Sequence, residues 1–137
     1  MDQDINQVRL SYGRCVASPT FFDDFYQFFQ SSSPAVKDRF KNTDMVKQKD
    51  LLRHGLSHLI MFAGGSKSAE MKVEQLSTSH DKDHMNIPGW MYRNWLDALL
   101  RTVKLHDKKM TQELDAQWKS VLQLGIDKMI AAHSRTK

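Results

Sequence analysis

Six histidines provide most of the metal-ligand chemistry in this sequence. His54 and His58 lie four residues apart, as do His80 and His84, and two imidazoles at that spacing on a helix can share a metal ion. Neither pair belongs to the HExxH pattern of zinc proteases. His54 and His58 fall between the apolar positions of their segment, so we expect them on a solvated face. The pair at 80 and 84 can act together only if its helix continues that far.

The rest of the composition excludes several kinds of site. Cys15 is the single cysteine, so an internal disulfide and a zinc site built on several thiolates are both excluded, and a reducing cytoplasm fits best. The net charge of +4 comes without a clustered basic stripe, which argues against a nucleic-acid partner. The longest apolar run, 59–63, is too short to span a membrane, and the N-terminus lacks a signal segment. We therefore predict a soluble cytoplasmic protein.

The elements that position these residues are predicted to be helices. A chain of 137 residues with 40% hydrophobic residues can fill one core, so we expect a single domain over 1–137. Prolines follow potential capping serines in Ser18-Pro19 and Ser33-Pro34, and Pro88 also stands where a helix can begin. Apolar residues recur at steps of three and four, and no segment alternates with period two. This pattern predicts an all-α fold of about seven helices, six of them over 5–16, 21–29, 45–63, 68–80, 91–103 and 114–130.

Two helix ends can be assigned from single residues. Thr43 or Asn42 is expected to cap the helix that begins near Met45. Gly64 and Gly65 are expected to end the same helix. A polar stretch then leads from His80 towards Pro88, where the chain must turn a corner.

Tyr26, Phe40, Gln48 and His80 together carry a family resemblance. The run FYQFFQSSSPAVKDRF, residues 25–40, resembles the second helix, the proline-opened third helix and the following corner of bacterial single-domain haemoglobins and flavohaemoglobins, which are members of the globin family. Tyr26 falls on the distal tyrosine of those proteins, Pro34 on the start of the third helix, and Phe40 on the corner phenylalanine that packs on the haem. A slightly shorter corner then places Gln48 on the distal glutamine.

The resemblance extends over roughly residues 4 to 130 and implies a haem site. The proximal histidine is expected 32 residues after Gln48, where His80 stands, with His84 as the alternative if the corner is displaced by one turn. It implies a globin fold of seven to eight helices around a pocket for haem b (iron protoporphyrin IX), with His80 as the axial iron ligand. Tyr26 and Gln48 would then donate hydrogen bonds to bound dioxygen. The implied haem-lining residues are Phe40, Leu52, Leu76, Ile87, Tyr92, Trp95 and Leu99.

The function implied first is reversible dioxygen binding, as a carrier, a scavenger or a gas-sensing module. Carbon monoxide and nitric oxide are the other expected ligands, and a monomer or homodimer is expected. A second hypothesis is a nitric oxide dioxygenase that depends on an external reductase, because the flavin and nicotinamide domains of flavohaemoglobins have no counterpart in this sequence. Asp127 is the only acidic residue after Asp115, so the glutamate that polarises the proximal histidine in those enzymes lacks a match. A third hypothesis is a haem-free globin-like module that binds a protein, such as a signalling partner.

Overall fold

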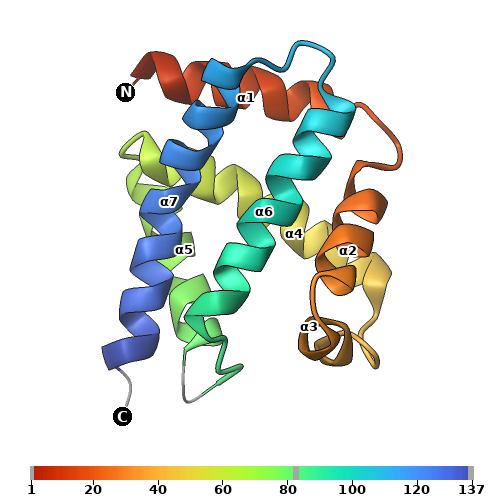
Figure 1. The fold of residues 1–137 in the computed structure, drawn as a ribbon. Helices are drawn as coiled ribbons and strands as arrows, with labels where there is room; N and C mark the ends of the chain where they lie inside the picture. Colours follow the sequence, from red (N-terminus) through yellow and green to blue (C-terminus); the bar gives the residue numbers. More distant parts are fainter. Residues whose placement is uncertain (1, 82–83, 136–137) are drawn as a thin grey trace.

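The computed structural model describes residues 2–81 and 84–135, and the regular secondary structure within them is entirely helical. This confirms the predicted all-α class, and the expected number of helices is found in the described residues. The helices are α1 (Asp2–Val16), α2 (Phe21–Ser31), α3 (Pro34–Arg39), α4 (Met45–Ala63), α5 (Lys67–His80), α6 (Gly89–His106) and α7 (Gln112–Arg135) (Figure 1).

Local sequence signals explain several helix ends. The Ser33 hydroxyl accepts a hydrogen bond from the amide of Ala35 at 3.2 Å, so this serine caps α3 as predicted. Gly64 is the C-cap of α4, and Gly65 follows with a φ of +85°, a left-handed conformation that glycine adopts without steric cost. Both glycines therefore end α4 where the sequence predicts.

Two predicted caps are wrong. Asp44, not Thr43 or Asn42, caps α4, because its carboxylate accepts hydrogen bonds from the amides of the first turn. The predicted cap lies one or two residues before the observed one, which is the usual error at helix boundaries. Ser18 does not cap α2, which begins at Phe21; its hydroxyl lies 2.7 Å from Nδ1 of His106 instead. This contact joins the corner between α1 and α2 to the end of α6.

The helices are arranged so that segments distant in sequence share the core. Helices α6 and α7 run antiparallel, and α4 crosses behind α6 (Figure 1). Helix α2 packs on α6, α1 packs on α7, and α5 packs on both α4 and α7. The largest fully buried side chains come from most of these helices: Trp118, Phe21, Phe25, Leu56, Ile60, Leu99 and Leu122. The apolar faces predicted from the three- and four-residue spacing therefore meet in one core.

A buried polar network connects α1 to the corner between α6 and α7. The side chain of Asp107 is fully buried and accepts a hydrogen bond from the Ser11 hydroxyl at 2.6 Å and a bidentate pair from Arg14 at 2.7 and 2.9 Å. The indole of Trp118 donates to the same Ser11 hydroxyl at 2.9 Å. Because both carboxylate oxygens of Asp107 have hydrogen-bond partners, the charge can be buried without a large desolvation penalty.

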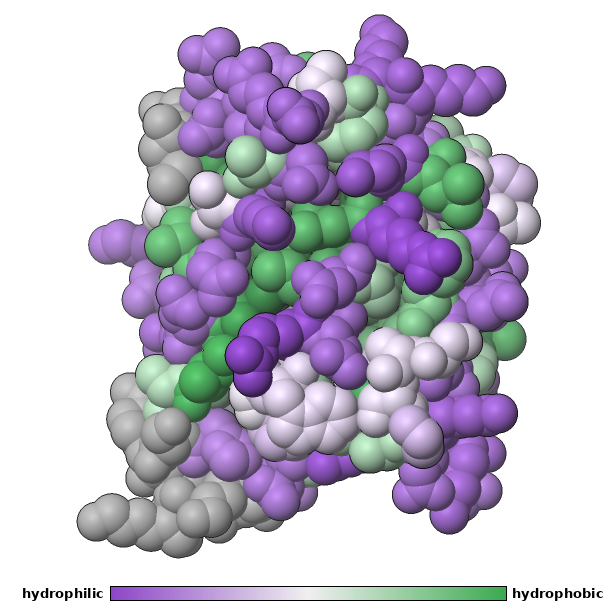
Figure 2. Space-filling model, in the orientation of Figure 1, coloured by the Kyte–Doolittle hydropathy of each residue, from purple (hydrophilic) through white to green (hydrophobic). Residues whose placement is uncertain are grey.

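The surface on the side seen in Figure 1 is mostly polar. Figure 2 shows hydrophilic side chains over most of the face in view, with a band of hydrophobic residues between them. No helix in the described residues combines the length and the apolar content that a membrane crossing requires.

Candidate functional site

A cavity of about 550 Å³ lies between the helices, and its walls come from α2 to α7. Most of its lining is aliphatic or aromatic, and a few polar side chains interrupt that lining. This size and this composition are typical of small-molecule and cofactor sites in proteins. The cavity is therefore the first place to look for the predicted site residues.

Nine of the ten residues predicted to form the site line this cavity. They come from four helices and two connecting segments, so residues up to 69 positions apart in the sequence (Tyr26 to Trp95) meet around one space. They are Tyr26, Phe40, Gln48, Leu52, Leu76, His80, Ile87, Tyr92 and Trp95.

Leu99 is the exception, because the structure places it behind the residues that line the cavity. Its side chain is fully buried, but it is not part of the cavity wall. It lies one helical turn beyond Trp95 on α6, where the buried face of the helix packs against other helices in the core. Leu99 therefore belongs to the core.

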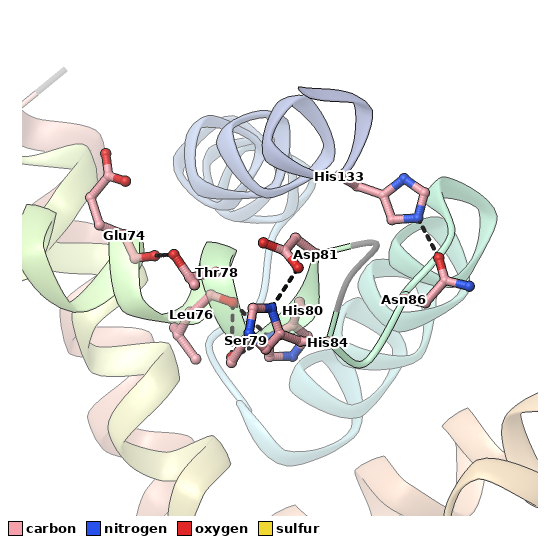
Figure 3. Close-up of polar contacts among 9 residues, drawn as sticks. All are labelled: Glu74, Leu76, Thr78, Ser79, His80, Asp81, His84, Asn86 and His133. Atoms are coloured by element: carbon pink, nitrogen blue, oxygen red, sulfur yellow. Dashed lines mark hydrogen bonds and ion pairs between the residues drawn. The ribbon is translucent and has the colours of Figure 1, made fainter. Parts of the chain in front are cut away.

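His80 is the last residue of α5 (Figure 3), and its half-buried side chain lines the cavity. Its Nδ1 atom lies 2.8 Å from the carbonyl oxygen of Leu76, one turn earlier, and 3.0 Å from the Ser79 hydroxyl. A carbonyl only accepts, so Nδ1 carries the proton and the lone pair of the neutral ring is on Nε2. Burial lowers the pKa of His80 and so favours the neutral form of the ring. The hydrogen bond with Leu76 raises the pKa and opposes this effect in part. The lone pair on Nε2 is therefore the one that could bind a metal ion.

His84, the alternative ligand, is placed differently. Helix α5 ends at His80, so the two histidines do not form a helical pair. The side chain of His84 is exposed, and its Nδ1 atom lies 2.7 Å from a carboxylate oxygen of Asp81 (Figure 3). It is not among the residues that line the large cavity. The geometry therefore favours His80 over His84 as the ligand.

Tyr26 from α2 and Gln48 from α4 form a polar pair in the cavity wall. The Gln48 side-chain amide donates to the Tyr26 hydroxyl at 3.2 Å, and that hydroxyl is 3.4 Å from the Gln48 backbone carbonyl. Burial raises the pKa of Tyr26 to about 12, partly offset by the Gln48 bond, so its hydroxyl stays neutral and able to donate. The long 3.4 Å contact is weak, so the hydroxyl proton can be given to a better acceptor in the cavity.

The hydroxyl of Tyr92 gives further evidence on whether the cavity suits a bound cofactor. Its hydroxyl is buried at the cavity wall and has no hydrogen-bond partner among the described residues. Burial raises its pKa to about 12, so the group is a neutral donor. A buried hydroxyl without a partner is costly, and a polar atom or water inside the cavity would remove that cost. The mainly apolar wall, the oriented imidazole and the unpaired hydroxyl together fit a large planar cofactor with a metal at its centre.

Several residues of the cavity wall are not indicated by the sequence pattern. His54 and His58 were expected on a solvated face; His54 is exposed, but both side chains line the cavity, and His58 is half-buried. Gln48, Leu52, Gly55 and His58 follow one another at steps of three and four residues, so they share one face of α4. This spacing is the signal in the sequence that places His58 on the same side of the helix as Gln48. Among the described residues that line the cavity, the charged ones other than histidine are Arg39 and Lys72. Both are cationic.

Comparisons with known proteins identify the fold family. No protein-family model and no curated protein matches the chain. Among solved structures, the chain is similar to the crystal structure of a protein from Pseudomonas aeruginosa PAO1 that is described as structurally highly homologous to a human hemoglobin. The identity is 40%, the TM-score is 0.91, and the match covers 95% of this chain and 98% of that chain. Together with the confirmed arrangement of helices, this match shows that the protein belongs to the globin family.

Proposed function

We propose that this globin binds haem b in the cavity, with His80 as the axial ligand, and that it reversibly binds dioxygen. The observation that carries the proposal is the hydrogen bond from His80 Nδ1 to the Leu76 carbonyl, which directs the ligating nitrogen away from the helix backbone. Lys72 in the cavity wall is suited to a haem propionate, which is anionic. When bound, the haem iron supplies the coordination site for a diatomic gas.

The residues of this chain would determine how strongly that gas is held. Tyr26 and Gln48 contribute a hydroxyl and an amide donor, and these would stabilise dioxygen more than carbon monoxide, because bound dioxygen carries more negative charge. The apolar side chains around the pair exclude water and so strengthen each hydrogen bond. Carbon monoxide and nitric oxide would be further ligands of the same site.

A hemin titration tests the proposal. Purified full-length protein is mixed with hemin, reduced, and exposed to dioxygen and carbon monoxide, and the Soret band is recorded for each form. We expect saturable binding of one hemin per chain and reversible shifts with each gas. In His80→Ala the ferrous haem signal should be largely lost, whereas the matched control His84→Ala should keep it. A wild-type protein that binds no hemin would contradict the proposal and favour a haem-free interaction module.

The distal donor pair also favours a second candidate function, a nitric oxide dioxygenase. Dioxygen held by Tyr26 and Gln48 would be attacked by nitric oxide to give nitrate, and an external reductase would restore ferrous iron. Stopped-flow mixing of the oxygenated protein with nitric oxide distinguishes the two functions. Conversion to the ferric form within milliseconds, with re-reduction by a cellular reductase, supports the enzyme; slow conversion supports a carrier, scavenger or sensor.

A further inference from the structure

The segment 84–88 folds back onto the last turn of α5. The amide of Met85 donates to the carbonyl of Ser79 at 3.1 Å, and the amide of Ile87 donates to the carbonyl of His80 at 3.1 Å. Between them, the amide of Asn86 donates to the carbonyl of Asp81 at 2.7 Å. The position of the segment 84–88 is therefore coupled directly to the backbone of His80.

Two side chains from distant parts of the sequence hold this segment in place. Arg39, at the end of α3, donates from Nη1 to the Met85 carbonyl at 2.7 Å and from Nη2 to the Asn86 carbonyl at 2.9 Å. His133, near the end of α7, lies with Nε2 2.8 Å from the Asn86 side-chain oxygen (Figure 3). We call this set of contacts the loop clamp.

The conformation of Asn86 indicates that the clamp holds a specific backbone geometry. Its φ of +54° is in the left-handed region, which asparagine tolerates better than most residues. In this conformation its carbonyl faces Arg39 while its side-chain oxygen faces His133. The two hydrogen bonds of the Arg39 guanidinium fix both the distance and the orientation of the Met85 and Asn86 carbonyls. With the His133 contact, the loop clamp holds the segment 84–88 from α3 and from α7.

We propose that Arg39 and His133 are positioning residues for His80. By holding the segment 84–88 against the last turn of α5, they would fix the direction in which the His80 imidazole meets the haem iron and would slow haem loss. This inference rests on the proposed function, because it requires haem bound through His80. It assigns Arg39 a task distinct from pairing with a haem propionate.

The test compares Arg39→Gln with wild type and with Lys37→Gln as the matched control. Lys37 is an exposed cation on the same helix and has no part in the clamp. Two measurements are made on hemin-reconstituted full-length protein: amide exchange of Met85, Asn86 and Ile87, and the iron–histidine stretching band of the ferrous form. For Arg39→Gln we expect about tenfold faster exchange, since two charged hydrogen bonds are lost, together with a shifted or broadened band. Lys37→Gln should match wild type in both.

Two further variants complete the test. Arg39→Lys retains the charge but cannot donate to both carbonyls in a fixed fork, so it should give intermediate exchange rates. His133→Ala should also speed exchange at Asn86, because it removes the contact from α7.

The possible outcomes separate this inference from the proposed function. Faster hemin loss in Arg39→Gln with wild-type exchange and a wild-type band would overturn the clamp and assign Arg39 to the haem carboxylates instead. Unchanged exchange in both Arg39→Gln and His133→Ala would also overturn it. Failure of wild type to bind hemin would overturn the proposed function and the positioning role together, and amide exchange of the hemin-free chain would still show whether the segment is held by Arg39.

Discussion

The Nδ1 atom of His80 lies 2.8 Å from the carbonyl oxygen of Leu76, one turn earlier on α5. This contact fixes both the tautomer and the direction of the ring, since only a protonated Nδ1 can donate to a carbonyl. Burial lowers the pKa of the same ring, although the Leu76 bond acts in the opposite direction. A neutral imidazole with a free Nε2 lone pair is the form that can bind iron.

Burial of neutral His80 makes stability depend on pH in a defined direction. Its pKa in the folded protein is below the ordinary 6.5, so the unfolded chain takes up the proton first as the pH falls. The stability that neutral His80 provides is therefore present above about pH 6.5 and is lost below it. In the hemin-free protein, the difference in unfolding free energy between wild type and His80→Gln should shrink from about pH 7.5 to about pH 5. Urea denaturation at each pH measures it. A difference that does not change with pH would contradict the burial of a neutral ring.

Tyr26→Phe should speed dioxygen release by about one to two decades, because a donor worth roughly 1.4 to 2.8 kcal/mol is removed from the distal site. The rate is measured by stopped-flow displacement of dioxygen with carbon monoxide. Tyr12→Phe is the matched control: Tyr12 is also buried, but its hydroxyl donates to the Arg53 carbonyl at 2.8 Å and does not line the cavity. A release rate in Tyr26→Phe equal to that of Tyr12→Phe would remove Tyr26 from the ligand site.

Much of the fold could be predicted because its signals are local. The three- and four-residue spacing of apolar side chains determines the helices, and Ser33-Pro34 and Gly64-Gly65 mark ends that depend only on neighbouring residues. The family resemblance then supplied which positions share the cavity, and that information is absent from local spacing. Tyr26 and His80 lie on different helices, and only tertiary packing brings both to the same cavity.

Other features could not be predicted because they depend on how helices cross. Leu99 and Trp95 share one face of α6, but the cavity ends between them, so only Trp95 lines it. The periodicity of a helix distinguishes inside from outside, but it does not distinguish a cavity wall from a packed core. Arg39 contacts backbone carbonyls of Met85 and Asn86, and such contacts leave no pattern in the sequence.

Asp107→Asn should lower the unfolding free energy by about 2 kcal/mol, since it weakens a buried ion pair with Arg14. Burial alone would raise the pKa of Asp107, but hydrogen bonds from Arg14, Ser11 and the Lys109 amide outweigh it, and the pKa lies below its ordinary 3.8. The carboxylate therefore stabilises the fold above about pH 4, and the difference between wild type and variant should close as the pH falls further.

Denaturant unfolding at about pH 7 and about pH 3 measures the Asp107 effect. Asp38→Asn is the control, because the pair between Asp38 and Lys41 is exposed, at 69% and 64% of their side-chain surface, and should contribute little. Equal losses in the two variants would contradict a special role for the network around Asp107.

Gly125→Ala tests how closely α7 approaches α4 beside the cavity. A Cβ atom at Gly125 would lie well inside van der Waals contact with the end of the Leu59 side chain, and Leu59 lines the cavity. Leu59 can turn into the cavity to relieve the clash, and alanine also gains about 1 kcal/mol of helix propensity over glycine. We therefore expect little change in the melting temperature of the hemin-free protein, but about tenfold weaker hemin binding because the cavity is narrower.

The control for this substitution is Gly13→Ala on α1, where an added Cβ meets nothing within 4 Å. It should stabilise the protein slightly through helix propensity and leave hemin affinity unchanged. Hemin affinity is measured by transfer to a haem scavenger, and stability by thermal unfolding. A large loss of stability in Gly125→Ala with unchanged hemin affinity would mean that Leu59 is held too tightly to move, and that the space beside α7 is not used by the cofactor.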